Sequence, residues 1–325
     1  TENRDAIAAA GGIAVLVGIL AGPASSKQAR TNAAGAILNL TMEDGAVRKV
    51  AVAEQGGIVP LLALVREGGV TARQRALGAL RNLALDDERS KSLIASSSDG
   101  IPLLVSWLSV DDIISCESAL GILQSLASTE DYIPLIVKAG GIAPLIGLLQ
   151  AESLVAQECA AGVLCNLTHE VKSRPEIVKA GAIAPLVELL RSGSAPAQEK
   201  AAGALRSLSA GSTQHAVAIV KETGVPPLAN LLRTGSEEAR THAAAALLNL
   251  SQGHAKHNDI VTKEGCVGPL VDLMRLGNIE GREYAAAVLW QLSKSGKSQT
   301  AISDAHGIPA LVELLLQSSP LAQVN

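Results

Sequence analysis

The sequence has 325 residues, of which 48% are hydrophobic but only 1% aromatic, and its formal net charge at pH 7 is −4. A single core stops growing at roughly 250–300 residues, so this length favours several domains or a repeated structure, and the mild charge without blocks of like sign argues against nucleic-acid binding. No apolar run reaches the about 20 residues of a membrane span, and TENRDAIAAAGG at the N-terminus lacks the pattern of a secretory signal.

One phrase recurs along the chain and predicts a repeated helix. It reads GGIAVLVGIL at 11–20, GGIVPLLALV at 56–65, GIPLLVSWL at 100–108, GGIAPLIGLL at 140–149, GAIAPLVELL at 181–190, GVPPLANLL at 224–232, GCVGPLVDLM at 265–274 and GIPALVELL at 307–315. The β-branched residue after the glycine recurs every 41 to 45 positions. A regular period of this length indicates a solenoid.

Each repeat predicts three helices. The first is short, as in RPEIVKAG, and the second begins near a proline, which suits the first turn of a helix. The third is the longest and closes on a leucine, found at positions 40, 83, 126, 167, 208, 250 and 292. We predict an all-α, right-handed solenoid that forms one domain over 1–325, with repeats at about 1–43, 44–86, 87–129, 130–170, 171–211, 212–253 and 254–295 and a partial eighth at 296–325.

These motifs resemble the armadillo repeat family. The resemblance rests on the period, on the GGIxPLVxLL second helix and on the AAxALxNL third helix, and it extends over the whole chain. HEAT repeats have a similar period, but they normally have two helices and no recurring Asn-Leu. Because Leu311, Leu314 and Leu315 look like core residues without a cover, we expect the chain to be a segment of a longer protein.

The residue before the closing leucine serves here as position 0 of each third helix. Positions −2, −3, −5, −6 and +1 are almost all Ala, Leu, Ile or Val, which predicts a buried stripe. Positions −8, −7, −4, −1 and 0 then form the opposite face. The resemblance implies that this face lines a concave groove holding an extended peptide.

Asparagine recurs at position 0, as Asn39, Asn82, Asn166 and Asn249, whereas Ser125, Ser207 and Gln291 interrupt the series. An asparagine side chain can both donate to and accept from a peptide backbone, and the resemblance implies that role here. The alternative is that each asparagine caps its own helix end or bonds to the next turn.

Position −4 carries no tryptophan. It is occupied by Gly35, Gly78, Gly121, Gly162, Gly203, Ala245 and Ala287. Armadillo proteins of the nuclear-import type, importin-α, usually carry tryptophan there, so the chain resembles adaptor-type armadillo proteins more closely. The glycines either let neighbouring third helices approach closely or deepen the groove for a ligand.

Positions −7 and −1 supply candidate specificity residues. Repeats two and five offer the basic pairs Arg75 with Arg81 and Lys200 with Arg206, repeat six offers His242, and repeat seven offers Tyr284 with Trp290. Such side chains are frequent anchors in binding interfaces. Glutamates at −8 can neutralise the basic residues, and Tyr284 and Trp290 can instead pack against a further repeat.

No catalytic motif is present, since HExxH, GxxxxGK[ST] and GxSxG are all missing from the sequence. His254, His257 and Asp259 lie close together in sequence, but a metal site needs more ligands in a defined geometry. We therefore expect no enzyme activity, no cofactor and no metal. None of the four cysteines forms a CxxC pair, so free thiols and a cytoplasmic location, with the nucleus as a second location, fit best.

The sequence thus predicts a scaffold or adaptor that binds extended peptides or helices of partner proteins, without nucleic-acid binding or membrane insertion. The protein would be a monomer or part of a larger complex. Two alternatives remain open. One is the substrate-recognition array of a larger enzyme, such as a U-box-type ubiquitin ligase. The other is a structural element of a ciliary or cytoskeletal assembly.

Overall fold

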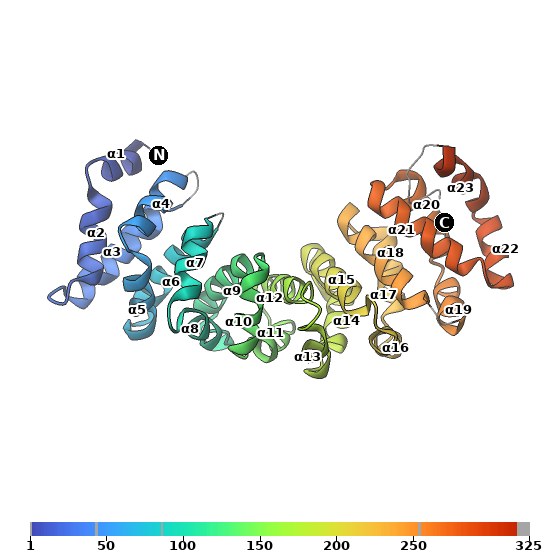
Figure 1. Cartoon of the computed structure of the whole chain (residues 1–325), viewed down its shortest axis with the longest axis horizontal. Helices are drawn as coiled ribbons and strands as arrows, with labels where there is room; N and C mark the ends of the chain where they lie inside the picture. The colour runs from blue at the N-terminus through green and yellow to red at the C-terminus, as the bar shows by residue number, and fades with distance from the viewer. Residues whose placement is uncertain (1, 43–44, 86, 253–254, 317–325) are drawn as a thin grey trace. The chain divides into compact units, whose positions relative to one another are not determined.

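The computed structural model describes residues 2–42, 45–85, 87–252 and 255–316, and the helical elements within them follow the predicted order (Figure 1). Contacts divide the chain into two compact units, Thr1–Val163 and Leu164–Asn325, with the division inside one third helix. The described residues contain no β-strand. The predicted all-α solenoid is therefore confirmed, whereas the predicted repeat boundaries remain a prediction.

Unit 1 contains three complete triplets of helices and most of a fourth. Its first helices are α1 (Glu2–Ala9), α4 (Ala46–Glu54), α7 (Glu88–Ser96) and α10 (Ile133–Lys138). Its second helices are α2 (Gly12–Ala21), α5 (Ile58–Glu67), α8 (Gly100–Ser106) and α11 (Ile142–Leu148). Its third helices are α3 (Lys27–Leu40), α6 (Val70–Ala84), α9 (Ile113–Ala127) and α12 (Leu154–Leu167), and two short 3-10 helices are η1 (Val110–Asp112) and η2 (Glu130–Tyr132).

Unit 2 continues from the end of α12. Its first helices are α13 (Arg174–Lys179), α16 (Thr213–Lys221), α19 (Ala255–Lys263) and α22 (Gly296–Asp304). Its second helices are α14 (Ile183–Ser192), α17 (Val225–Thr234), α20 (Val267–Leu276) and α23 (Gly307–Leu316). Its third helices are α15 (Ala195–Ser209), α18 (Glu237–Ser251) and α21 (Ile279–Leu292).

Small aliphatic side chains build the core, as the composition predicts. In α6 the stripe predicted to be apolar is fully buried, and it consists of Ala76, Leu77, Ala79, Leu80 and Leu83. The third helices of successive repeats pack side by side, α3 on α6 and α6 on α9 in unit 1, and α15 on α18 and α18 on α21 in unit 2. All four cysteines are free thiols, and three of them are buried.

No single helix in the described residues is long and apolar enough to span a membrane. Two bent helix pairs, α1 with α2 and Glu130–Lys138 with α11, meet the length and composition criteria only when each pair is taken together.

Arginines at the end of second helices link neighbouring repeats in unit 2. Arg191 donates from Nη2 to the Thr223 carbonyl at 3.0 Å, and Arg233 donates to the Gly265 carbonyl at 2.8 Å. Arg275 repeats the contact with the His306 carbonyl at 3.2 Å. Each accepting carbonyl belongs to the turn between the first and second helices of the next repeat, so these bonds fix consecutive triplets to one another.

In every described repeat except the third, that turn contains one residue with a left-handed backbone, and two of these residues, Thr223 (φ 56°) and His306, are not glycine. Glycine provides it at Gly11, Gly56, Gly140, Gly181 and Gly265, with φ between 70° and 86°. His306 occupies the equivalent place with φ 53°, and its Cβ makes this conformation unfavourable. The bond from Arg275 needs only the His306 carbonyl, which any residue supplies.

We predict that His306→Gly stabilises the protein by about 0.5–1 kcal/mol, because relief of the left-handed penalty exceeds the entropy cost of glycine. Thermal unfolding of the two proteins measures the difference. Asp304→Gly, at the end of helix α22 rather than in the turn, is the control and should be destabilising. An equal decrease in both variants would contradict the backbone explanation.

Candidate functional site

The candidate site is the third-helix face, defined as positions −8, −7, −4, −1 and 0 of the third helices. These positions recur at helical spacing, so their side chains project from one side of each helix. Packing of third helices side by side then places the faces of α3, α6 and α9 next to one another, and those of α15, α18 and α21 likewise (Figure 1).

The asparagines at position 0 bond to the preceding repeat. Nδ2 of Asn249 donates to the Arg206 carbonyl at 3.0 Å and to the Ser209 hydroxyl at 3.2 Å. Nδ2 of Asn82 makes the same pair of contacts, both at 3.4 Å, with the Leu38 carbonyl and the Thr41 hydroxyl. The amide thus satisfies the carbonyl end of the previous third helix, and the described hydrogen bonds leave Oδ1 as an acceptor on the face.

The remaining members of this series differ. Asn39 is exposed and makes no described hydrogen bond, Asn166 has a partner, and Gln291 donates to the Ser251 carbonyl at 3.2 Å. The described contacts of Asn82 and Asn249 therefore differ from the local capping alternative, because each amide bonds to the third helix of the preceding repeat and not to its own.

The glycines at position −4 accommodate side chains from neighbouring repeats. A Cβ on Gly78 would lie 3.1 Å from Leu38, and one on Gly121 would lie 2.7 Å from Arg81 Nε. In the same way a Cβ on Gly162 would meet Gln124, and one on Gly203 would meet Cys165. In each case the residue at −1 of one repeat lies over the −4 position of the next. The glycines thus serve close approach, but of a side chain rather than of a neighbouring helix backbone.

Arg75 and Arg81 both lie on the face of unit 1. Arg75 packs over Gly35 and donates from Nη1 to the Thr31 carbonyl and to Asn32 Oδ1, both at 3.2 Å. Arg81 is exposed and lies over Gly121. Neither forms an ion pair with a carboxylate among the described residues of unit 1.

The face of unit 2 carries a cluster that links three repeats, here called the Arg206 cluster: Arg206, His242, Glu280 and Tyr284. Arg206 donates from Nη2 to Tyr284 Oη at 2.6 Å and to Glu280 Oε1 at 2.9 Å. Its Nη1 lies 3.2 Å from His242 Nδ1, and its guanidinium carbon lies 4.9 Å from the Tyr284 ring centroid. Arg206 is therefore already neutralised and held in place.

Lys200 and Trp290, the other predicted site residues of unit 2 at positions −7 and −1, also have described partners. Lys200 pairs with Glu199 at 3.1 Å, as the alternative of neutralisation by the glutamates at −8 expects. The Lys294 Nζ lies 3.8 Å from the ring centroid of Trp290, which is 46% exposed. Tyr284 packs with Arg206 rather than with Trp290 in the described contacts.

Sequence comparison identifies the family. The family described as "Plant U-box protein ARM repeat region" matches residues 1–264 of this chain. The chain belongs to that armadillo family. No curated protein matches the sequence.

Solved structures share the armadillo fold. The crystal structure of one engineered protein is 30% identical, covers 98% of this chain and 78% of its own, and has a TM-score of 0.87. A second engineered protein is 29% identical over 74% of this chain and 97% of its own, with a TM-score of 0.67. A designed armadillo repeat protein in complex with the peptide (KR)4 is 23% identical over 71% and 98%, with a TM-score of 0.62. Armadillo arrays of this kind are typically non-catalytic scaffolds.

No metal centre forms in the part of the chain that the structure describes, because no three His, Cys, Asp or Glu side chains are grouped to hold an ion. His254 lies outside the described residues. His257 uses Nδ1 to contact the Leu250 carbonyl at 2.7 Å, which is a helix-end contact rather than a ligand geometry.

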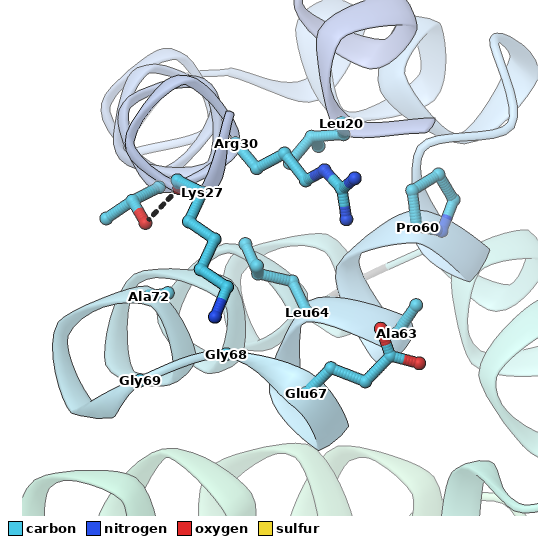
Figure 2. Close-up of a pocket in the computed structure, with 11 residues that line it drawn as sticks. Leu20, Lys27, Arg30, Pro60, Ala63, Leu64, Glu67, Gly68, Gly69 and Ala72 are labelled. Carbon is cyan, nitrogen blue, oxygen red and sulfur yellow. Dashed lines mark hydrogen bonds between the residues drawn. The ribbon is translucent and has the colours of Figure 1, made fainter. Parts of the chain in front are cut away.

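A separate pocket of about 480 Å³ lies in unit 1 where α2 and α3 meet α5 and α6. Figure 2 shows Lys27, Arg30 and Glu67 around Leu64, with the Arg30 side chain extending into the space. Arg30 Nε is buried without a hydrogen-bond partner. The sequence did not indicate this pocket, since its residues come from two helix pairs and share no motif.

Sequence reasoning also missed Glu280 and the hydroxyls that accept from the asparagines. Glu280 stands at −11, outside the predicted face, but reaches Arg206 two repeats earlier. Thr41 and Ser209 stand at +2 of their repeats and accept from the asparagine of the next repeat. A threonine or serine recurring at +2 was the available signal.

The pKa of His242 is lowered, first by burial and then by the Arg206 guanidinium, although Glu199 and Glu280 oppose the shift. Lys200 adds to the lowering. The folded protein therefore binds this proton less readily than the unfolded chain, and stability is lost as pH falls through the unfolded value of about 6.5.

We predict that His242→Gln removes part of the stability loss seen between about pH 7.5 and pH 5, because glutamine does not titrate in that range. Urea unfolding at both pH values measures it. The exposed His169→Gln is the matched control and should leave the loss as in the wild type. A pH dependence unchanged by His242→Gln would contradict the assignment.

Proposed function

We propose that the protein is a non-enzymatic scaffold that binds extended segments of partner proteins along its third-helix face. The observation that carries the proposal is the Oδ1 acceptors of Asn82 and Asn249, which remain on the face after Nδ2 has bonded to the preceding helix. An extended peptide has backbone N–H groups that need such acceptors. The exposed amide of Asn39 offers donors as well.

The spacing of the helices suits an extended ligand. Packed helices lie about 8–10 Å apart, and an extended chain rises about 3.3 Å per residue, so each repeat matches about three ligand residues. The designed armadillo protein that holds (KR)4 shows that this fold can bind a peptide. The four free cysteines support a cytoplasmic location for such an adaptor.

A second role follows from the family match over residues 1–264. The array would recognise the substrate of a U-box-type ubiquitin ligase, and the catalytic function would lie in another part of the full-length protein. The test is transfer of ubiquitin to a bound partner by the full-length protein. A full-length protein that binds the partner but transfers no ubiquitin would leave only the scaffold role.

We predict that a photo-reactive side chain at Asn39 on α3 will crosslink peptides selected for binding from a random library. The same group at Val47, which is 83% exposed on the first helix α4, is the control and should not react. Mass spectrometry of the adducts gives the comparison. Equal crosslinking from both positions would place the ligand away from the third-helix face.

A further inference from the structure

We propose that the third-helix face of unit 1 selects acidic extended peptides through Arg75 and Arg81. This inference rests on the proposed peptide-binding function and names its ligand class. The surface, here called the Arg75–Arg81 patch, consists of Arg75 and Arg81 with Asn39 and Asn82.

The two arginines of the patch carry positive charge that unit 1 does not neutralise. The ion pairs of the described residues in unit 1 use other side chains, such as Arg73 with Asp112 and Arg89 with Glu54. Among the described residues, Arg75 donates hydrogen bonds to neutral oxygens only, those of Thr31 and Asn32. Hydrogen bonds to neutral acceptors leave a guanidinium able to attract a carboxylate.

Comparison of equivalent positions explains why Arg81 is unpaired and Arg206 is paired. Both stand at −1 of their repeats, and Arg206 finds Glu280 and Tyr284 at −11 and −7 of the third helix two repeats later. The equivalent positions for Arg81 are Val155 and Cys159, which supply no carboxylate.

The surroundings of Arg81 agree with this equivalence of positions two repeats apart. Burial raises the pKa of the Cys159 thiol, and the Arg81 guanidinium opposes this increase. Arg81 therefore lies near Cys159, the residue that is equivalent to Tyr284 in the surroundings of Arg206. Val155 is 48% exposed one turn before Cys159.

Two glutamates lie near the Cys159 thiol, as Arg81 does. They are Glu117 and Glu158, at position −8 of their repeats, and their negative charges help to raise the pKa of the Cys159 thiol. The Glu117 carboxylate accepts from the Ser153 hydroxyl at 2.6 Å, and neither glutamate forms an ion pair with Arg81.

The patch combines charge with backbone recognition. The Asn82 Oδ1 and the Asn39 amide can bond to a peptide main chain, while the arginines bind aspartate or glutamate side chains. Two more cations without described ion pairs, Lys27 and Arg30, line the pocket of Figure 2. Thr31 lines the same pocket, together with the carboxylate of Glu67, and accepts from Arg75 through its carbonyl.

Fluorescence anisotropy with labelled peptides of about 12 residues, long enough to cross several repeats, tests the proposal. Three probes share one serine-rich backbone and carry glutamate, lysine or alanine at alternate positions. We expect the glutamate probe to bind most tightly, and we expect its affinity to fall as the salt concentration is raised. Preference for the lysine or alanine probe would overturn the acidic specificity.

Substitutions locate the binding. The double substitution Arg75→Gln with Arg81→Gln should lower the affinity for the glutamate probe at least about tenfold, because two cations without a described ion pair are lost. Arg66→Gln with Arg89→Gln is the matched control and should change the affinity of the glutamate probe less than about twofold, since these cations lie on the second helix α5 and the first helix α7 and are ion-paired with Asp99 and Glu54. Circular dichroism confirms that each variant is folded.

The outcomes separate this inference from the general function. If none of the three probes binds and no peptide can be selected from the library, both the peptide-binding function and the acidic specificity are overturned. Selected peptides that bind and crosslink at Asn39 without acidic preference would overturn only the inference. A loss in the Arg66 and Arg89 variant as large as that in the Arg75 and Arg81 variant would also overturn it.

Discussion

The structure depends on one steric constraint, which is the absence of a large side chain at position −4 of the third helices. In four successive pairs of repeats the −1 side chain of one repeat lies over the −4 glycine of the next, as Arg81 does over Gly121 and Gln124 over Gly162. Even a methyl group on Gly121 would come within 2.7 Å of Arg81. The helix propensity lost at each glycine, about 1 kcal/mol relative to alanine, is offset by this inter-repeat packing.

The same packing determines which charges are available to a ligand. The Arg206 side chain reaches the residues at −7 and −11 of the third helix two repeats later, where Glu280 neutralises it and Tyr284 accepts from it. The equivalent positions for Arg81 are Cys159 and Val155, which carry no carboxylate. Two faces of similar composition therefore differ chemically, and the difference arises from the array rather than from either repeat alone.

The repeated helices, the buried stripe and the family could be predicted from the sequence because they follow from local periodicity. The pairing of Arg206 with Glu280, 74 positions away, could not, because it depends on helix packing across two repeats. The sequence groups Tyr284 with Trp290 because one repeat offers both, but Tyr284 accepts a hydrogen bond from Arg206 two repeats earlier. Lys200, in contrast, pairs with Glu199 on its own helix. Asn82 and Asn249 bond to the third helix of the preceding repeat.

The most direct test gives Arg81 a carboxylate partner like the one that Glu280 provides for Arg206. Val155→Glu puts an acidic group at the position equivalent to Glu280, and Val155→Gln is the neutral control of the same length. Titration of both variants with the glutamate probe measures the effect. We expect Val155→Glu to weaken binding about as much as loss of the Arg81 charge does, whereas Val155→Gln should retain near wild-type affinity. Equal affinity of the two variants would contradict the claim that residues two repeats apart control the charge of this face.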